Sequence, residues 1–143
     1  MTVNYVPKGC QTVIPYLVVS SSKKLIEFLE ATFETKATEC MMRPDGSVGH
    51  AEVPIGDSVV MVSDASPEHP AGKAAIYVYV PDTDAAYKRA VAAGAKSIVE
   101  PADQFYGDRN AGVQDAFGNT WWIGTHKEDV PPEEMQRQMT AHK

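Results

Sequence analysis

Residues 14–33, IPYLVVSSSKKLIEFLEATF, and residues 75–94, AIYVYVPDTDAAYKRAVAAG, present the same features in the same order. Each stretch begins with a run of β-branched and aromatic residues, which is typical of a strand. Each continues through Ser, Asp or Thr, which cap helix N-termini, into a segment with apolar residues at helical spacing. Aligned end to end, the two stretches place Tyr16 on Tyr77. The chain is therefore predicted to contain a duplicated strand–helix unit.

The remainder of each half is predicted to form three strands joined by turns, which gives the order β-α-β-β-β twice. Strands are expected over residues 12–19, 36–43, 47–55, 58–64, 75–80, 96–100, 109–115 and 119–125. Helices are expected from the Ser20–Ser22 caps to Phe33, from Asp82 or Thr83 to Gly94, and over residues 131–140. Gly56 and Gly118 lie in the turns of two hairpins, and residues 67–72 link the halves.

Length and composition limit the kinds of function. The chain has 143 residues, the size of one domain, so a single domain is expected over residues 1–143. A net charge of −6 without a Lys/Arg cluster argues against a nucleic-acid partner. No apolar run approaches the roughly 20 residues of a membrane helix, so no membrane partner is expected. Cys10 and Cys40 fit no zinc spacing and are expected to be reduced thiols; with no leader-like apolar segment at the start, the expected location is cytoplasmic.

Three stretches carry a resemblance to a known family. They are IPYLVV (14–19), PDGSVGHAEVPIGDSVVMVSD (44–64) and YGDRNAGVQDAFGNTWWIGTHKEDV (106–130), the last followed by PPEEMQRQ (131–138). With these stretches the chain resembles the vicinal-oxygen-chelate superfamily, which includes glyoxalase I, extradiol dioxygenases and bleomycin-resistance proteins. It is most similar to the PhnB-like, glyoxalase-like branch. The resemblance covers about residues 12–138.

The resemblance implies an α+β fold. Two βαβββ modules, residues 12–64 and 75–125, would form a curved eight-stranded mixed sheet around a cavity, with an extra C-terminal helix over residues 131–140. Members of this family usually pair as homodimers, so a homodimer is expected here as well.

The resemblance also indicates where metal-using members place their ligands. These positions fall on Ile14 in the first strand, on Val60 or Met61 in the fourth, on Ala75 in the fifth and on Trp122 in the last. None of these side chains is a useful ligand for iron, zinc or manganese. The family's metal-dependent chemistry is therefore not expected, and no metal or other cofactor is predicted.

The alternation of side chains along strands predicts a ligand site. Ile76, Val78 and Val80 are expected to pack under the second helix, so the intervening side chains would face the cavity. The candidate ligand-binding residues on this face are Tyr16, Tyr77, Tyr79, Gln114 and Trp122. Arg109, at the start of a strand near the mouth of the cavity, is a further candidate. His50 and Glu52, two residues apart on one strand, are the candidate catalytic residues, because such a pair can transfer protons near neutral pH.

Each candidate has another interpretation. His50 and Glu52 would face solvent if the hairpin register shifted by one residue. The tyrosines can instead belong to the core or to a dimer interface, and Arg109 can hold Asp108 or Asp115 structurally. Trp121 is expected in the core, and Asp64, His69 and His126 on the surface. A metal displaced onto His50 and Glu52 would need a third ligand, which the sequence does not identify.

Two functional hypotheses follow. In the first, the protein binds a flat or cationic metabolite or drug in an aromatic-lined, dimeric cavity without a metal, as a bleomycin-resistance protein does. In the second, it is a glyoxalase-like lyase, isomerase or dioxygenase that uses a displaced metal or the His50–Glu52 pair as acid and base.

Overall fold

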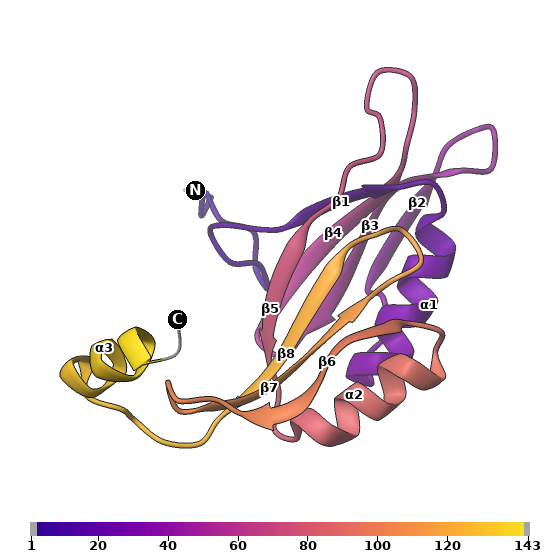
Figure 1. Ribbon diagram of the computed structural model, residues 1–143. Coiled ribbons are helices and arrows are strands. Elements are labelled where there is room, and N and C mark those ends of the chain that lie inside the picture. Colours follow the sequence, from indigo (N-terminus) through magenta and orange to yellow (C-terminus); the bar gives the residue numbers. More distant parts are fainter. Residues whose placement is uncertain (1–2, 142–143) are drawn as a thin grey trace.

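The computed structural model describes residues 3–141 and contains the predicted β-α-β-β-β order twice, followed by a third helix. The first module consists of β1 (Tyr16–Val19), α1 (Ser22–Phe33), β2 (Glu39–Met42), β3 (Val48–Ile55) and β4 (Ser58–Asp64). The second consists of β5 (Ala75–Tyr79), α2 (Thr83–Ala92), β6 (Lys96–Asp103), β7 (Asp108–Gln114) and β8 (Thr120–His126). The α+β class and the two βαβββ modules are thus confirmed (Figure 1).

The eight strands divide into two mixed sheets of four, with the orders β1-β4-β3-β2 and β5-β8-β7-β6. The first strand of each module pairs in parallel with the last, so that Tyr16 is opposite Met61 and Tyr77 is opposite Trp122. The remaining pairs are antiparallel. The structure therefore contains two matching sheets instead of the expected single eight-stranded sheet, because β1 and β5 each lie at the edge of their own sheet.

The first strand begins later than expected, at Tyr16 instead of residue 12. Pro15 has no N–H to donate to a strand ladder, although its carbonyl still accepts a bond from the Met61 amide. The preceding segment is held to the sheet by a side chain instead. Gln11 donates to the Val59 carbonyl at 2.8 Å and accepts from the Val59 amide at 3.0 Å.

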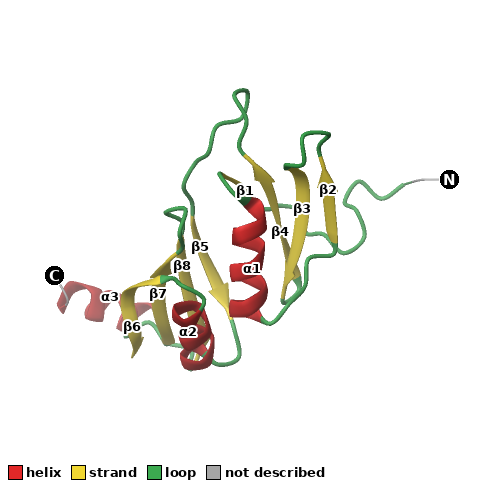
Figure 2. Ribbon diagram, turned by 90° about the vertical axis from the view of Figure 1, so that its right-hand side faces the viewer, coloured by secondary structure: helices red, strands yellow, loops and turns green. Residues whose placement is uncertain are grey.

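Helices α1 and α2 cover the same side of the two sheets (Figure 2). Ser21 and Asp82 cap them, each accepting a hydrogen bond from the amide three residues further on. The core lies between these helices and the strands, and Ile76, Val78 and Val80 pack against it as expected. Its most deeply buried apolar side chains include Leu25, Leu29, Val53, Val62, Val113, Trp121 and Ile123.

No described helix packs on the opposite, concave side of the sheets. Side chains that alternate with the core residues consequently remain accessible there: Tyr16, Tyr77 and Tyr79 are 50%, 40% and 62% exposed. The C-terminal helix α3 (Pro132–Ala141) lies apart from both sheets and buries none of its described residues (Figure 1). Within the described residues, no helix is long and apolar enough to cross a membrane.

Asp115 organises the turn between β7 and β8. Its carboxylate accepts bonds from the Phe117 and Asn119 amides, from the Asn119 side chain and, at 2.9 Å, from the indole of Trp121. Trp121 is fully buried and packs 5.9 Å from the Phe33 ring, so the turn also joins the second sheet to α1. The neighbouring Trp122 points to the concave side instead.

Two adjacent tryptophans on opposite faces give a test of this arrangement. Trp121→Ala should lower the free energy of unfolding by about 3–5 kcal/mol, because it leaves a core cavity and removes a partner from Asp115. Trp122→Ala should cost clearly less, since its ring is only partly buried. Urea denaturation of both variants measures the difference, and equal losses would contradict the assigned faces.

Candidate functional site

Cross-strand register defines the concave surface, because residues directly opposite each other share a face of the sheet. In the first sheet one concave row runs Tyr16, Met61, Glu52 and Glu39 across β1, β4, β3 and β2. In the second sheet the corresponding row begins with Tyr77, Trp122 and Gly112. Tyr16 and Met61 thus correspond to Tyr77 and Trp122 in the two modules.

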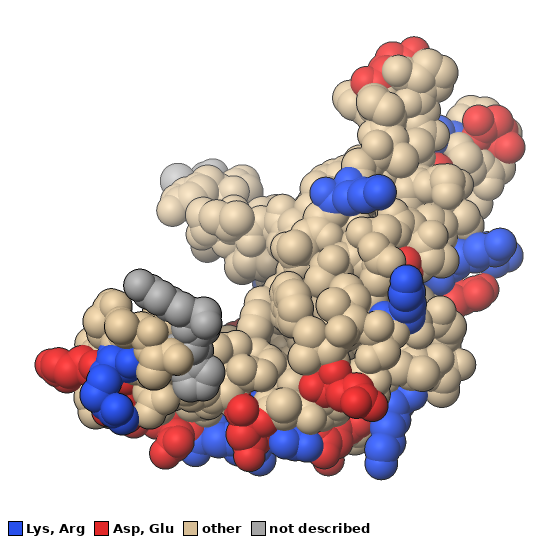
Figure 3. Space-filling model, in the orientation of Figure 1, with Lys and Arg blue, Asp and Glu red and all other residues tan. Residues whose placement is uncertain are grey.

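Charged side chains are scarce in the middle of the surface seen in Figure 3, over β5 and β8, and gather mainly toward the helices, the lower rim and the tips of the upper loops. The molecule is hollowed between its N-terminal segment and α3 in this view. A groove of about 370 Å³ lies between β5 and the hairpin of β3 and β4. Its lining includes Tyr77 and Tyr79.

Three side chains of the second module meet at the Asp108 carboxylate. The hydroxyls of Tyr77 and Tyr79 both donate to Asp108 Oδ2, at 2.7 and 2.8 Å. The tyrosine rings lie 5.1 Å apart between centroids. On the other oxygen, His126 Nδ1 lies 2.8 Å from Asp108 Oδ1. We call Tyr77, Tyr79, Asp108 and Trp122 the tyrosine–aspartate site.

Two glycines make room for these rings. A Cβ on Gly124 would lie 2.5 Å from the Tyr77 hydroxyl oxygen, and a Cβ on Gly112 would lie 2.6 Å from the Trp122 ring. Each ring therefore lies directly over a neighbouring strand where any larger residue would displace it. With Gly124 between them, the Tyr77 hydroxyl on β5 can reach Asp108 on β7 across β8.

The ionisation of the site follows from these contacts. Burial opposes ionisation of Asp108, but hydrogen bonds from His126, Tyr77 and Tyr79 outweigh it and hold the Asp108 pKa below its ordinary value. Burial, with the Asp108 contact, raises the pKa of Tyr77; the hydrogen bond to Asp108 is the main cause that raises the pKa of Tyr79. At neutral pH the site therefore holds a buried carboxylate that accepts hydrogen bonds from two neutral phenols.

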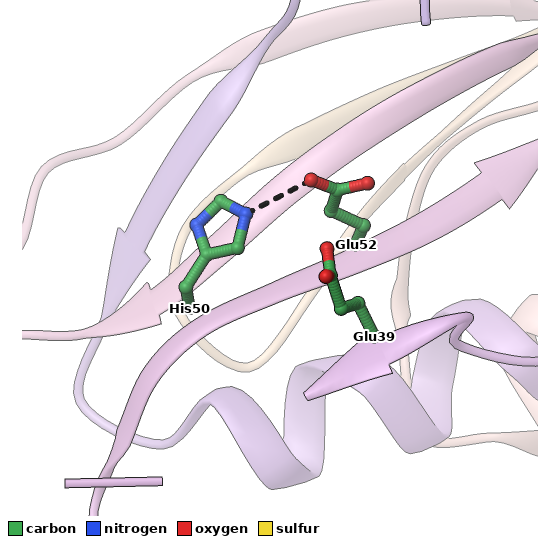
Figure 4. Close-up of side chains that lie close together, drawn as sticks. All are labelled: Glu39, His50 and Glu52. Carbon is green, nitrogen blue, oxygen red and sulfur yellow. Dashed lines mark hydrogen bonds and ion pairs between the residues drawn. The ribbon is translucent and has the colours of Figure 1, made fainter. Parts of the chain in front are cut away.

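A second group lies on the concave side of the first module (Figure 4). His50 Nε2 is 3.1 Å from Glu52 Oε2, and both side chains are about one-fifth exposed. The His50 ring lies 5.9 Å from the Tyr16 ring. Glu39, on β2, extends toward the same point, and one ligand atom from each of the three residues lies within 4.8 Å of the others.

Two predicted residues do not join either group. Gln114 is on the concave face but at the opposite end of β7 from Asp108, about 20 Å away along the strand. Arg109 lies on the helix side, which corrects its predicted place at the mouth of the cavity. Its guanidinium makes a bidentate pair with Asp84 of α2 at 2.9 and 3.0 Å and contacts Asp103 at 3.2 Å. Its partners are therefore neither Asp108 nor Asp115.

Sequence reasoning missed Asp108, His126 and Glu39 as members of these groups. His126 is exposed, as expected, but its two ring nitrogens also face Asp108 and Asp129. One signal could have indicated that Asp108 and His126 lie together. Asp108 begins β7 and His126 ends β8, so the two residues are register partners in this hairpin.

The residues at the family's metal positions do not fit a metal. Register selects Met61 over Val60, because Met61 shares the concave row with Tyr16, whereas Val60 is buried in the core. Ile14, Met61, Ala75 and Trp122 then offer one thioether and no oxygen or imidazole ligand. These four side chains therefore cannot support a reaction step that depends on a metal at that position.

Paired βαβββ modules with one open concave face define a class of protein, and comparison with known proteins identifies the family. The family model "Glyoxalase/Bleomycin resistance protein/Dioxygenase superfamily" matches residues 11–123. The chain belongs to this superfamily.

Related proteins and solved structures also resemble this chain. The chain is 32% identical over 138 residues to "Uncharacterized protein Mb0911c" of Mycobacterium bovis, covering 89% of this chain and 91% of that protein. It is equally similar to "Uncharacterized protein Rv0887c" of Mycobacterium tuberculosis, covering 89% of this chain and 81% of the relative. Among solved structures, TioX from Micromonospora sp. ML1 has a TM-score of 0.69 at 23% identity, over 81% of this chain and 98% of TioX. This last likeness concerns the fold alone.

The His126 contacts predict a pH dependence. Hydrogen bonds to Asp108 and then to Asp129 raise the pKa of His126 above its ordinary value. The folded state therefore favours the imidazolium, which stabilises the protein below the ordinary pKa of about 6.5 and ceases to do so as the pH rises through the raised value. The stability difference between the wild type and His126→Gln should be larger near pH ~6 than near pH ~8.5.

Urea denaturation at the two pH values measures this difference. His69→Gln, in an exposed loop, is the matched control for replacing a histidine. A His126→Gln effect that is the same at both pH values would contradict the proposed ion pairs.

Proposed function

We propose that the protein binds a flat, cationic small molecule at the tyrosine–aspartate site. The observation that supports this proposal is the combination of accessible ring faces with a buried, ionised carboxylate that their hydroxyls contact. Tyr77 and Tyr79 are 40% and 62% exposed, and the hydroxyls of both converge on Asp108. Large aromatic groups left accessible on a concave surface are typical of ligand sites.

The chemistry of the ligand follows from these groups. A ring of the ligand can stack on Tyr79 or Trp122, and a positive charge is favoured by the ring faces and by Asp108. Such a cation–ring contact contributes about 0.5–2 kcal/mol, depending on how far it is desolvated. The adjoining groove of about 370 Å³ is within the usual size range of small-molecule pockets.

The proposal includes that binding at the tyrosine–aspartate site requires no metal. It is supported by the side chains at the family's metal positions, of which Trp122 is proposed to contact the ligand instead. We also propose that two chains form a homodimer that covers the open concave faces, and that the protein belongs to the PhnB-like branch. A cytoplasmic location is supported by Cys10 and Cys40, which are both free thiols in the structure.

A second candidate function is a glyoxalase-like lyase or isomerase reaction. It is favoured by the hydrogen bond between His50 and Glu52, which places an acid–base pair on the concave side of the first module. In this candidate, one group removes a proton from a carbon next to a carbonyl, and the other donates its own proton at a neighbouring atom.

The binding proposal is tested by titrating a set of planar aromatic cations into protein kept in EDTA, with calorimetry and thermal shift as readouts. At least one compound should bind the wild type. Tyr79→Leu, which removes a half-exposed ring, should weaken binding about 2- to 30-fold, the equivalent of one cation–ring contact. Tyr79→Phe, which keeps the ring, should stay much closer to the wild type.

Asp108→Asn provides the charge test. It should weaken binding of the cation more than binding of a neutral ligand of the same shape. The proposal is wrong if no planar cation binds, if EDTA abolishes binding, or if Tyr79→Leu and Tyr79→Phe behave alike.

A further inference from the structure

The first module carries two carboxylates on directly opposite residues of neighbouring strands. Glu39 on β2 is directly opposite Glu52 on β3 in the antiparallel register. Like charges at such positions destabilise a sheet. Within the described residues, no Lys or Arg forms an ion pair with either carboxylate, and His50 is the one ionisable partner of Glu52.

The three side chains converge on the concave side, with one ligand atom from each within 4.8 Å of the others. His50 and Glu52, two residues apart on β3, project from the same face, and Glu39 reaches that face from the neighbouring strand (Figure 4). Two ligands that each lie about 2.0–2.2 Å from an ion are separated by about 3 Å. The distance of 3.1 Å between His50 Nε2 and Glu52 Oε2 is of this size, so a metal can replace the hydrogen bond with little movement of β3.

We propose that Glu39, His50 and Glu52 bind a divalent metal ion. One imidazole with two carboxylates suits zinc and the divalent ions of manganese, iron, cobalt and nickel. Bound between Glu39 and Glu52, the ion removes the repulsion of the two carboxylates.

The proposed site lies beside a position at which metal-using members of the family place a ligand. Glu52 is the register partner of Met61, which occupies the family's position on β4. The ligand set therefore lies one or two strands further out on the same concave face, with strands about 4.8 Å apart. The Tyr16 ring beside His50 forms one wall of the site.

Three protein ligands leave coordination positions open to the concave side, as in catalytic metal sites. The class of molecule that fits them is a small compound with an oxygen donor, such as a carboxylate or carbonyl, and an apolar part that contacts Tyr16. This site is separate from the tyrosine–aspartate site, since it uses no residue of the second module.

The test uses the full chain, freed of metal by chelator and dialysis. Zinc is titrated by calorimetry, and cobalt(II) by its visible absorption, which reports the coordinating atoms. We expect one ion per chain. Glu39→Gln and His50→Gln should each weaken binding by more than the roughly 10–100-fold that loss of an outer-sphere partner costs.

Two matched controls make the same kinds of substitution elsewhere on the surface. Glu100→Gln changes an exposed carboxylate on β6, and His69→Gln changes an exposed loop histidine. Both should bind zinc as the wild type does. Glu39 is exposed, so Glu39→Gln is expected to fold normally, which circular dichroism verifies.

Absence of binding at millimolar zinc would overturn the proposal, as would binding that Glu39→Gln and His50→Gln leave unchanged. Because Tyr79→Leu should leave the zinc affinity unchanged, failure of the metal site and failure of the planar-cation site are distinguishable.

Discussion

The parallel pairing of the first and last strand in each module is the constraint on which the rest of the structure depends. It aligns Tyr16 with Met61 and Tyr77 with Trp122, and the alternation of strands then decides which side chains enter the core. Because α1 and α2 both cover one side of the sheets, every concave side chain must come from a strand or from a segment beyond the modules. The register of the strands thus determines which side chains lie on the accessible concave face.

The two modules use this shared frame for different chemistry. In the second, small residues at Gly112 and Gly124 let aromatic rings lie across neighbouring strands, so that phenol donors reach a carboxylate two strands away. In the first, the corresponding face carries His50 with two glutamates and one ring, that of Tyr16. Once the central metal positions are filled by apolar groups, each half is free to hold its own polar cluster.

Much of the fold could be predicted because its signals are local. The caps at Ser21 and Asp82, the helical stripes and the alternating strands each depend on a few neighbouring residues, and the repeat shows how to combine them. The concave position of Tyr77 and Tyr79 follows from the same alternation. The convergence of both tyrosines on Asp108 could not be predicted in this way, since it requires the alignment of three strands that are distant in sequence. The place of Arg109 was wrong for a related reason: one residue along β7 separates the concave face from the face that meets Asp84.

A shift of one residue in the β2–β3 ladder decides where Glu39 lies. Counting outward from the Arg43–Ser47 contact at the Pro44–Gly46 turn, a regular hairpin would pair Glu39 with Ala51, a core residue, and would direct Glu39 away from His50. The ladder instead shifts by one residue between Met41 and Met42, so that Glu39 pairs with Glu52. Bulges of this kind re-aim side chains by leaving one residue, here Gly49, without a partner. The third ligand of the proposed metal site therefore exists only because of an irregularity that residue patterns do not reveal.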